Sequence, residues 1–114
     1  MPAPRPGSPV RGSETGRPIM ALLDLLGRKT ALRLLWELRN GSLKFRELQA
    51  AAGTNPGLLN KRLAELREVG IVDLAADGYR LTPDGRDLLD LLLPLTGWAE
   101  GWSRRLEGAP EDGG

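Results

Sequence analysis

Cysteine and histidine are both absent from this chain of 114 residues. Without cysteine there is no disulfide, no thiolate metal site and no thiol redox sensor. Without histidine the chain lacks the usual metal ligand and the most frequent general base. We also find no glycine-rich phosphate loop and no paired acidic motif in a catalytic context. We therefore expect a protein that is not an enzyme and that uses no cofactor or metal.

Long apolar runs are missing as well. The first residues contain no apolar stretch of the kind that a secretory signal needs. The leucine-rich run near residue 90 is interrupted by Asp90 and Pro94, and it is too short to span a bilayer. The length allows one domain and little more, so we expect a small cytoplasmic protein with no membrane partner.

The net charge of +1 conceals two blocks of opposite sign. Residues 28–67 carry nine basic and three acidic side chains, whereas residues 68–114 carry four basic and ten acidic ones. Such a division indicates that one region meets a polyanion while another is kept away from it. A solvated helical surface with an incidental bias gives the same signal, so the charge pattern needs support from the motifs.

The two ends of the chain differ from its middle. Residues 1–17 are rich in proline and glycine and hold almost no apolar side chains, which predicts a disordered N-terminal tail. Residues 18–107 contain the periodic apolar patterns of a folded domain. Residues 108–114 are polar, and we expect a second disordered tail there.

Three helical patterns lie in the first half of the domain. Apolar residues recur at helical spacing over residues 19–26, 29–39 and 44–52. In the second pattern Leu32, Leu35, Trp36 and Leu38 are expected to face inward, with Trp36 as a core anchor, because large aromatic side chains dominate burial in small cores. The cations of that pattern are expected in solvent: Arg28, Arg33 and Arg39.

The stretch over residues 53–70, GTNPGLLNKRLAELREVG, predicts a tight turn followed by a helix with two different faces. Asn55 suits the N-cap and Pro56 the first helical position. The inner face consists of leucines at helical spacing, namely Leu59, Leu63 and Leu66. The opposite face carries small, amide and cationic side chains, namely Gly57, Lys61, Ala64 and Glu68, with Asn60 and Arg62 on its flanks.

The helix over 44–52 and the helix over 56–69 are separated by three residues that include Gly53, which describes a helix-turn-helix. After Gly70 the apolar period changes to about two, and residues 71–74 and 79–82 read as strands. Asp77 and Gly78 are the favoured pair for a tight hairpin turn between them. A hairpin placed directly after such a helix is a wing, and its one cation, Arg80, limits its DNA contact to phosphate or the minor-groove edge.

The last part of the domain is again helical. Thr82 is a suitable N-cap for a helix that starts at Pro83, Pro94 interrupts it, and a final segment runs over residues 95–106. A small domain cannot bury all the leucines of this region together with Trp98 and Trp102, and a large exposed apolar surface marks an interface. The first and last helices are therefore candidates for a homodimer interface.

Five stretches in order, LLDLLGRK, LRLLWEL, LKFRELQAAAG, LLNKRLAELREVGIV and YRLTPDGRDLL, resemble the HxlR-type winged helix-turn-helix transcriptional regulators. The resemblance runs from Ile19 to Trp102. It implies a mainly α fold with a short β-hairpin, a dimer built by the first and last helices, and a helix that enters the major groove from Pro56. The chain has Thr30 where the family often has Trp, a shorter wing, and no cysteine for thiol sensing.

We therefore expect a homodimeric, sequence-specific transcriptional regulator that binds double-stranded DNA. Asn60 and Lys61 are assigned to base edges, and Gly57 to close approach of the backbone at the groove. The remaining expected contacts go to phosphate: Thr54 and Asn55 at the helix start, and Lys44, Arg46 and Arg80 along the DNA backbone.

Three points stay open at this level. Arg62 is either a DNA contact or an internal strut paired with Glu65 or Glu37. The fold also suits a winged-helix module that contacts another protein. A third interpretation is a small-molecule-responsive regulator, with an effector pocket at the dimer interface lined by Trp36, Trp98 and Trp102.

Overall fold

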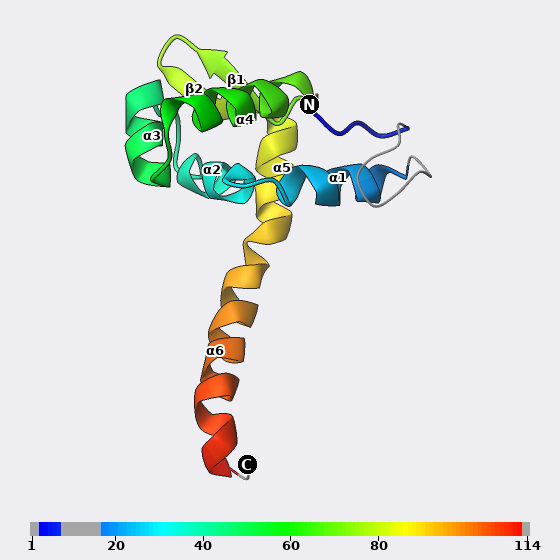
Figure 1. Ribbon diagram of the computed structural model, residues 1–114, viewed down its shortest axis with the longest axis vertical. Coiled ribbons are helices and arrows are strands. Elements are labelled where there is room, and N and C mark those ends of the chain that lie inside the picture. The colour runs from blue at the N-terminus through cyan, green and yellow to red at the C-terminus, as the bar shows by residue number, and fades with distance from the viewer. Residues whose placement is uncertain (1–2, 8–16, 113–114) are drawn as a thin grey trace.

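The computed structural model describes residues 3–7 and 17–112 and shows a mainly helical chain with one two-stranded hairpin (Figure 1). The predicted winged helix-turn-helix fold is confirmed. None of the described helices is long and apolar enough to cross a membrane. The elements in chain order are α1 Pro18–Leu26, α2 Ala31–Glu37, α3 Phe45–Ala52, α4 Pro56–Glu68, β1 Val72–Ala75, β2 Gly78–Leu81, α5 Pro83–Leu92 and α6 Pro94–Asp112.

The core is built almost entirely from leucine, and helices α1 to α5 and the hairpin all contribute to it. Its largest fully buried side chains are Leu34, Leu35, Leu38, Leu48, Leu59, Leu63, Leu66 and Val72. The expectation that Leu32 and Trp36 face inward is wrong, since both are exposed. Because α2 has only seven residues, Leu34 and Leu35, together with Leu38 directly after the helix, already fill its inner side. The Trp36 ring instead lies under the guanidinium of Arg39, at 4.0 Å from the ring centroid.

The hairpin differs from its predicted form by one residue in each strand. Val72 pairs with Leu81 and Ala75 with Gly78, so the connecting residues are Ala76 and Asp77 rather than Asp77 and Gly78. Gly78 is needed for another reason: a side chain there would overlap the backbone carbonyl of Leu43. Leu43 forms an antiparallel bridge with Tyr79, through N–H···O distances of 3.0 and 2.8 Å. The hairpin is therefore joined to the start of α3.

The C-terminal helices begin as the sequence predicts, but the last one extends further. The Thr82 hydroxyl accepts a hydrogen bond of 3.0 Å from the Gly85 N–H at the start of α5. α6 then runs from Pro94 to Asp112, so residues 108–112 are helical rather than part of a tail. α6 extends away from the other helices (Figure 1). The radius of gyration is accordingly 16.5 Å, whereas a compact chain of this length has about 13 Å.

Part of the predicted N-terminal tail lies against the domain. The Arg5 guanidinium contacts the Glu68 carboxylate at 3.1 Å and also donates to the Glu68 backbone carbonyl. Glu68 ends α4, and a cation is favoured at the C-terminal end of a helix because of the helix dipole. Residues 3–7 of the predicted tail thus include a contact with the end of α4, while residues 1–2 and 8–16 lie outside the described residues.

Candidate nucleic-acid interface

The turn between α3 and α4 has the predicted geometry. Gly53 adopts φ 64°, ψ 40°, the left-handed conformation that glycine takes without strain, and its N–H bonds the carbonyl of Gln49 at 3.0 Å. The Asn55 side chain accepts a hydrogen bond of 2.8 Å from the Leu58 N–H, and Pro56 occupies the first helical position. The three residues 53–55 thus hold α4 at a fixed angle to α3.

α4 has one buried and one exposed face, as predicted. Leu59, Leu63 and Leu66 are at most 2% exposed. The outer face consists of exposed residues at helical spacing, namely Gly57, Asn60, Lys61, Ala64 and Glu68. A Cβ at Gly57 would meet only the Asn55 side chain, at an ordinary 3.5 Å, so the fold itself does not require glycine there. Arg5 contacts this face at its Glu68 end, and Gly57, Asn60, Lys61 and Ala64 are exposed.

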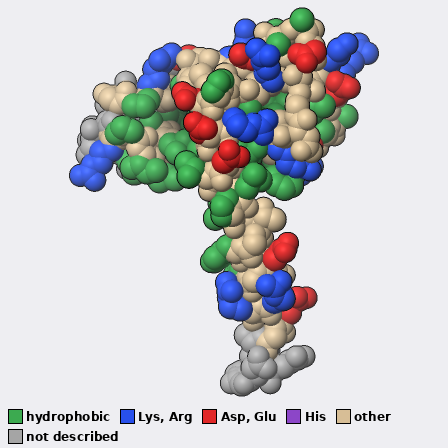
Figure 2. Space-filling view, turned by 180° about the vertical axis from the view of Figure 1, so that it is seen from behind, with side chains coloured by type: hydrophobic (Ala, Val, Ile, Leu, Met, Phe, Trp, Pro, Cys, Tyr) green, Lys and Arg blue, Asp and Glu red, His purple; other side chains and the backbone are tan. Residues whose placement is uncertain are grey.

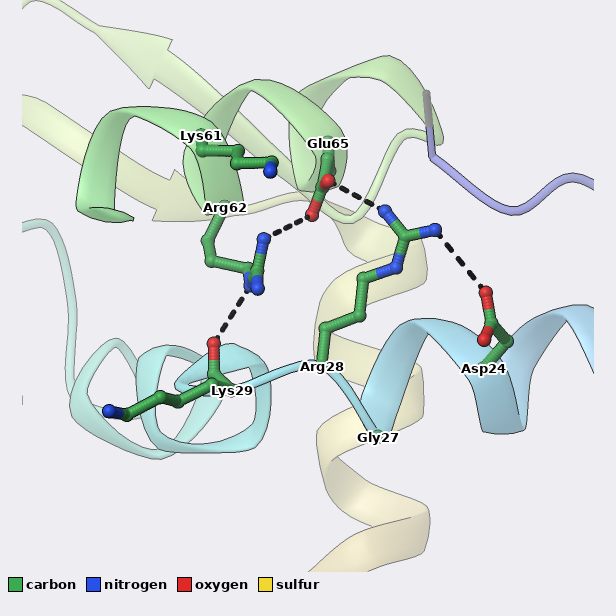
Figure 3. Close-up of a pocket in the computed structure, with 7 residues that line it drawn as sticks. All are labelled: Asp24, Gly27, Arg28, Lys29, Lys61, Arg62 and Glu65. Carbon is green, nitrogen blue, oxygen red and sulfur yellow. Dashed lines mark hydrogen bonds and ion pairs between the residues drawn. The ribbon is translucent and has the colours of Figure 1, made fainter. Parts of the chain in front are cut away.

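A chain of alternating charges fastens the inner side of α4 to the junction of α1 and α2 (Figure 3). The Glu65 carboxylate accepts from Arg28 at 2.6 Å and from Arg62 at 3.2 Å, and Arg28 also contacts Asp24 at 3.3 Å. All four side chains are at most 12% exposed. Buried charges of this kind are tolerated only when each has partners, and here every buried polar side-chain atom of the described residues has one.

This network supports the strut role of the two that the sequence left open for Arg62. Its guanidinium bonds Glu65 and, through Nε, the backbone carbonyl of Lys29 at 2.8 Å, so Arg62 joins α4 to the segment that precedes α2. The expectation that Arg28 stays in solvent is wrong, because Arg28 lies between Asp24 and Glu65. Sequence spacing could have indicated the Asp24–Arg28 pair, but Arg28 and Glu65 are 37 residues apart and no local pattern joins them.

The other cations that we assigned to phosphate come from the start of α3 and from the hairpin, two segments that the Leu43–Tyr79 bridge joins. Lys44 and Arg46, at the start of α3, are exposed. Arg80 is also exposed, but its Nε donates to the Asp73 carboxylate across the hairpin at 2.9 Å. That hydrogen bond, together with the nearby negative charge, raises the pKa of Arg80 above its ordinary value. The wing therefore presents a cation that is already paired. Thr54, in the turn, is half-buried.

An apolar hollow of about 460 Å³ lies between α2 and the junction of α5 with α6. Trp36 borders it, but Trp98 and Trp102 do not: their rings stack on each other along α6, with centroids 5.7 Å apart. Figure 2 shows hydrophobic side chains gathered where α6 leaves the rest of the molecule. The lining consists mainly of leucines: Leu32, Arg33, Leu35, Trp36, Leu89, Leu92, Leu93, Leu95 and Thr96.

Comparison with known proteins identifies the same arrangement elsewhere. A family model described as HxlR-like helix-turn-helix matches residues 25–107. The HTH-type transcriptional regulator Rv3095 of Mycobacterium tuberculosis is 33% identical over 102 residues, which cover 83% of this chain and 65% of that relative. The chain therefore spans about 65% of the length of this relative.

Two solved structures are similar in fold. A transcriptional regulator of the MarR family from Enterococcus faecalis superposes with a TM-score of 0.69 at 30% identity, covering 78% of this chain and 88% of that one. The quinone-bound YodB from Bacillus subtilis superposes with a TM-score of 0.68 at 25% identity, covering 73% of this chain and 96% of that one. The named relatives are regulators of transcription and not enzymes.

Proposed function

The chain belongs to the HxlR-like helix-turn-helix family, and from that premise we propose that it is a homodimeric transcriptional regulator that binds specific sites in double-stranded DNA. In this proposal α4 enters the major groove and the β1–β2 hairpin lies beside it as the wing. The cytoplasmic location expected from the sequence belongs to the same proposal.

The single observation that carries the proposal is the uncovered outer face of α4. Gly57, Asn60 and Lys61 are exposed, while the opposite face is fixed in the core by leucines and by the Glu65 ion pairs. α6 does not cover this face within one chain, because it leaves the molecule on the side away from α4 (Figure 1). A rigid helix with a bare polar face has the shape and chemistry that a major groove accepts.

The residue roles follow from this placement. Asn60 and Lys61 reach base edges, since an amide pairs with adenine and an ammonium with the acceptors of guanine. Gly57 lets the backbone at the start of α4 approach the groove closely. Thr54 and Asn55 at that helix start, with Lys44, Arg46 and Arg80 beside it, contact phosphates and set the register. Arg62 is left out of this list because its Nε and one terminal nitrogen donate to groups inside the protein.

The dimer is supported by apolar side chains that remain in solvent on one face of α6. Leu95, Trp98, Trp102 and Leu106 recur at helical spacing, and each is 48–60% exposed. α1 adds Ile19 and Leu23, which are 55% and 54% exposed. A second copy that covers these surfaces also supplies a second α4, and a separation of roughly 34 Å between the two helices matches one turn of DNA.

Duplex binding tests the proposal directly. Fluorescence anisotropy on the DNA upstream of the gene for this protein, and on a shuffled duplex, is measured across a series of salt concentrations. We expect binding to both at low salt, with the logarithm of the affinity falling linearly with that of the salt concentration, and a tighter protected site in the upstream DNA. Absence of any salt-dependent binding would favour the protein-contact module.

Gly57→Ala sharpens this test, because the added methyl group has room in the free protein. Alanine also favours helix over glycine, by up to about 1 kcal/mol in a helix interior. We expect unchanged or slightly raised thermal stability together with weaker binding to the upstream site. An unchanged affinity for DNA would show that the start of α4 does not approach the groove closely.

A second candidate is a regulator that responds to a small apolar molecule, and the apolar hollow beside Trp36 favours it. The similar YodB structure is described as quinone-bound. A flat apolar compound in this hollow should quench Trp36, so a quinone is titrated against tryptophan fluorescence. The saturable part of the quenching should disappear in Trp36→Phe; quenching that persists there would come from Trp98 and Trp102 on α6.

A further inference from the structure

Residues 3–7 lie beside the C-terminal end of α4, although they come before α1 in the chain (Figure 1). Ala3 is 6% exposed, and Pro4 is also buried. Residues 6 and 7 form a turn in which Gly7 has φ 88°. A Pro-Gly pair with positive φ at the glycine is typical of a type II turn. Burial and the turn thus give this short segment a defined conformation beside the helix.

Arg5 contacts the last residue of α4 at two points. Its Nε donates to the Glu68 carboxylate at 3.1 Å, and one terminal nitrogen donates to the Glu68 backbone carbonyl at 3.2 Å. That carbonyl belongs to the last turn of the helix, where unpaired carbonyls and the helix dipole favour a cation. Arg5 is therefore held at Glu68 by the backbone of the helix as well as by the opposite charge.

Glu68 is the carboxylate that α4 exposes. The other carboxylate of this fully described helix, Glu65, is 4% exposed and is paired inside the protein. Lys61 and Glu68 lie about two turns apart on the same outer face. Without Arg5, the charges of Lys61 and Glu68 on that face would cancel. The sign of the charge on the outer face thus depends on the N-terminal segment.

We propose that Arg5 keeps the outer face of α4 attractive to the phosphates of DNA by neutralising Glu68. This proposal rests on the proposed function, in which that face approaches a duplex. A free carboxylate there would repel phosphates, since like charges placed across an interface disfavour binding. The charge of Arg5 is already paired, so Arg5 acts through Glu68 and is not itself a phosphate contact.

The size of the effect follows from Coulomb's law. In water, two unit charges about 10 Å apart interact with an energy that corresponds to about a twofold change in affinity. Several phosphates surround a helix in a groove, whereas salt screens charges over about 10 Å at 0.1 M. We therefore expect a change of about twofold to threefold at low salt, which becomes smaller as salt is added.

The test uses substitutions to glutamine that each remove one charge. Arg5→Gln leaves Glu68 without its partner, Glu68→Gln removes the carboxylate, and the double variant removes both charges. Two matched controls lie on α6, where Arg104→Gln and Glu107→Gln remove the same charges from exposed positions. All variants should keep the melting temperature of the unmodified protein, because exposed ion pairs contribute little to stability.

Affinity for the shuffled duplex is measured by anisotropy across a series of salt concentrations. At low salt we expect Arg5→Gln to bind about twofold to threefold more weakly, and Glu68→Gln to bind more tightly by a similar factor. The double variant should return to the affinity and the salt slope of the unmodified protein, because the pair is replaced by two neutral groups. Both α6 controls should bind as the unmodified protein does.

Three results would overturn the proposal. A double variant that binds as weakly as Arg5→Gln, with a salt slope lower by about one, would show that Arg5 itself contacts phosphate. An equal loss in Arg104→Gln would show that only the net charge of the protein matters. Unchanged affinity in Arg5→Gln would show that Glu68 does not lie near phosphates.

A protein that binds no duplex at all would contradict the proposed function, and immobilised heparin then replaces DNA as the polyanion. The salt concentration needed for elution should be highest for Glu68→Gln and lowest for Arg5→Gln. The unmodified protein and the double variant should elute together between them. Elution of Arg5→Gln with the unmodified protein would overturn the neutralisation of Glu68 independently of any DNA binding.

Discussion

α4 and α6 each carry a stripe of apolar residues, but only α4 covers its stripe within the chain. Leu59, Leu63 and Leu66 of α4 are buried, and its polar face is free. On α6 no described side chain is buried, and Trp98 is 60% exposed. The difference indicates that α4 is held by the fold so that its outer face can act, whereas α6 needs a second surface to cover it.

The largest difference in unfolding free energy should appear between alanine substitutions of a leucine on α4 and a leucine on α6. Leu66→Ala removes a fully buried side chain and should cost about 2–5 kcal/mol of unfolding free energy. Leu106→Ala, which is 58% exposed, should change that free energy by less than about 0.5 kcal/mol in the monomer but weaken the dimer. Urea denaturation at low protein concentration and sedimentation velocity measure the two effects. Equal losses of stability would contradict the distinction between the helices.

The ion pairs on the inner side of α4 should give the next largest effect. Glu65→Gln leaves Arg28 and Arg62 without their carboxylate in a site that solvent hardly reaches, and we expect a loss of about 3 kcal/mol. Glu37→Gln is the matched control, because its partner Arg33 is 56% exposed, and it should cost at most about 1 kcal/mol. Thermal or urea unfolding compares them; similar losses would show that burial does not strengthen the dependence on Glu65.

A substitution on the outer face of α4 should change the affinity for DNA and leave the stability of the fold unchanged. Lys61→Ala should leave the unfolding free energy within about 0.5 kcal/mol of that of the unmodified protein, since the side chain is exposed and unpaired among the described residues. Affinity for the footprinted site should fall by about 1–3 kcal/mol if the ammonium reads a base. Anisotropy on the site and on a shuffled duplex gives both values. Unchanged affinity for the site would remove Lys61 from the interface.

The smallest effect is expected in the wing. Arg80→Ala should weaken binding to all duplexes alike and lower the salt slope by about one. The effect on affinity is limited because Arg80 already forms an ion pair with Asp73. The hydrogen bond that Arg80 donates to Asp73 holds the pKa of Arg80 above its ordinary value, so the cation is present at every pH used for binding, and Arg80 itself adds no pH dependence. A loss confined to one DNA sequence would contradict a phosphate contact.

The features of α4 that depend on residues close in the sequence could be predicted from local patterns. The Asn55 cap, the three-residue turn and the leucine stripe were all predicted, because caps and helical periodicity act over a few residues. Two features depend on contacts between distant segments and were missed. One is the Arg28–Glu65 pair, and the other is the exposure of Trp36, which composition alone assigns to the core.

The assignment of Gly78 was wrong for a related reason. Asp77-Gly78 is a typical turn pair, but the close contact with Leu43 places the glycine inside β2 and moves the turn back by one residue. A short motif predicts the backbone conformations that its residues favour. It does not predict which segment, distant in the sequence, packs against it. The predicted roles of Gly57, Asn60 and Lys61 remain predictions for the same reason, since they depend on a partner outside the chain.

The bridge between Leu43 and Tyr79 has a consequence for engineering the hairpin. The Gly78 end of β2 packs against the segment that leads into α3. Residues inserted at the base of the wing would therefore displace α3. Growth is tolerable only at the tip, between Ala76 and Asp77, and in even steps that preserve which strand face meets the core. Grafting basic residues at that tip would extend the reach of the wing while leaving the helix pair undisturbed.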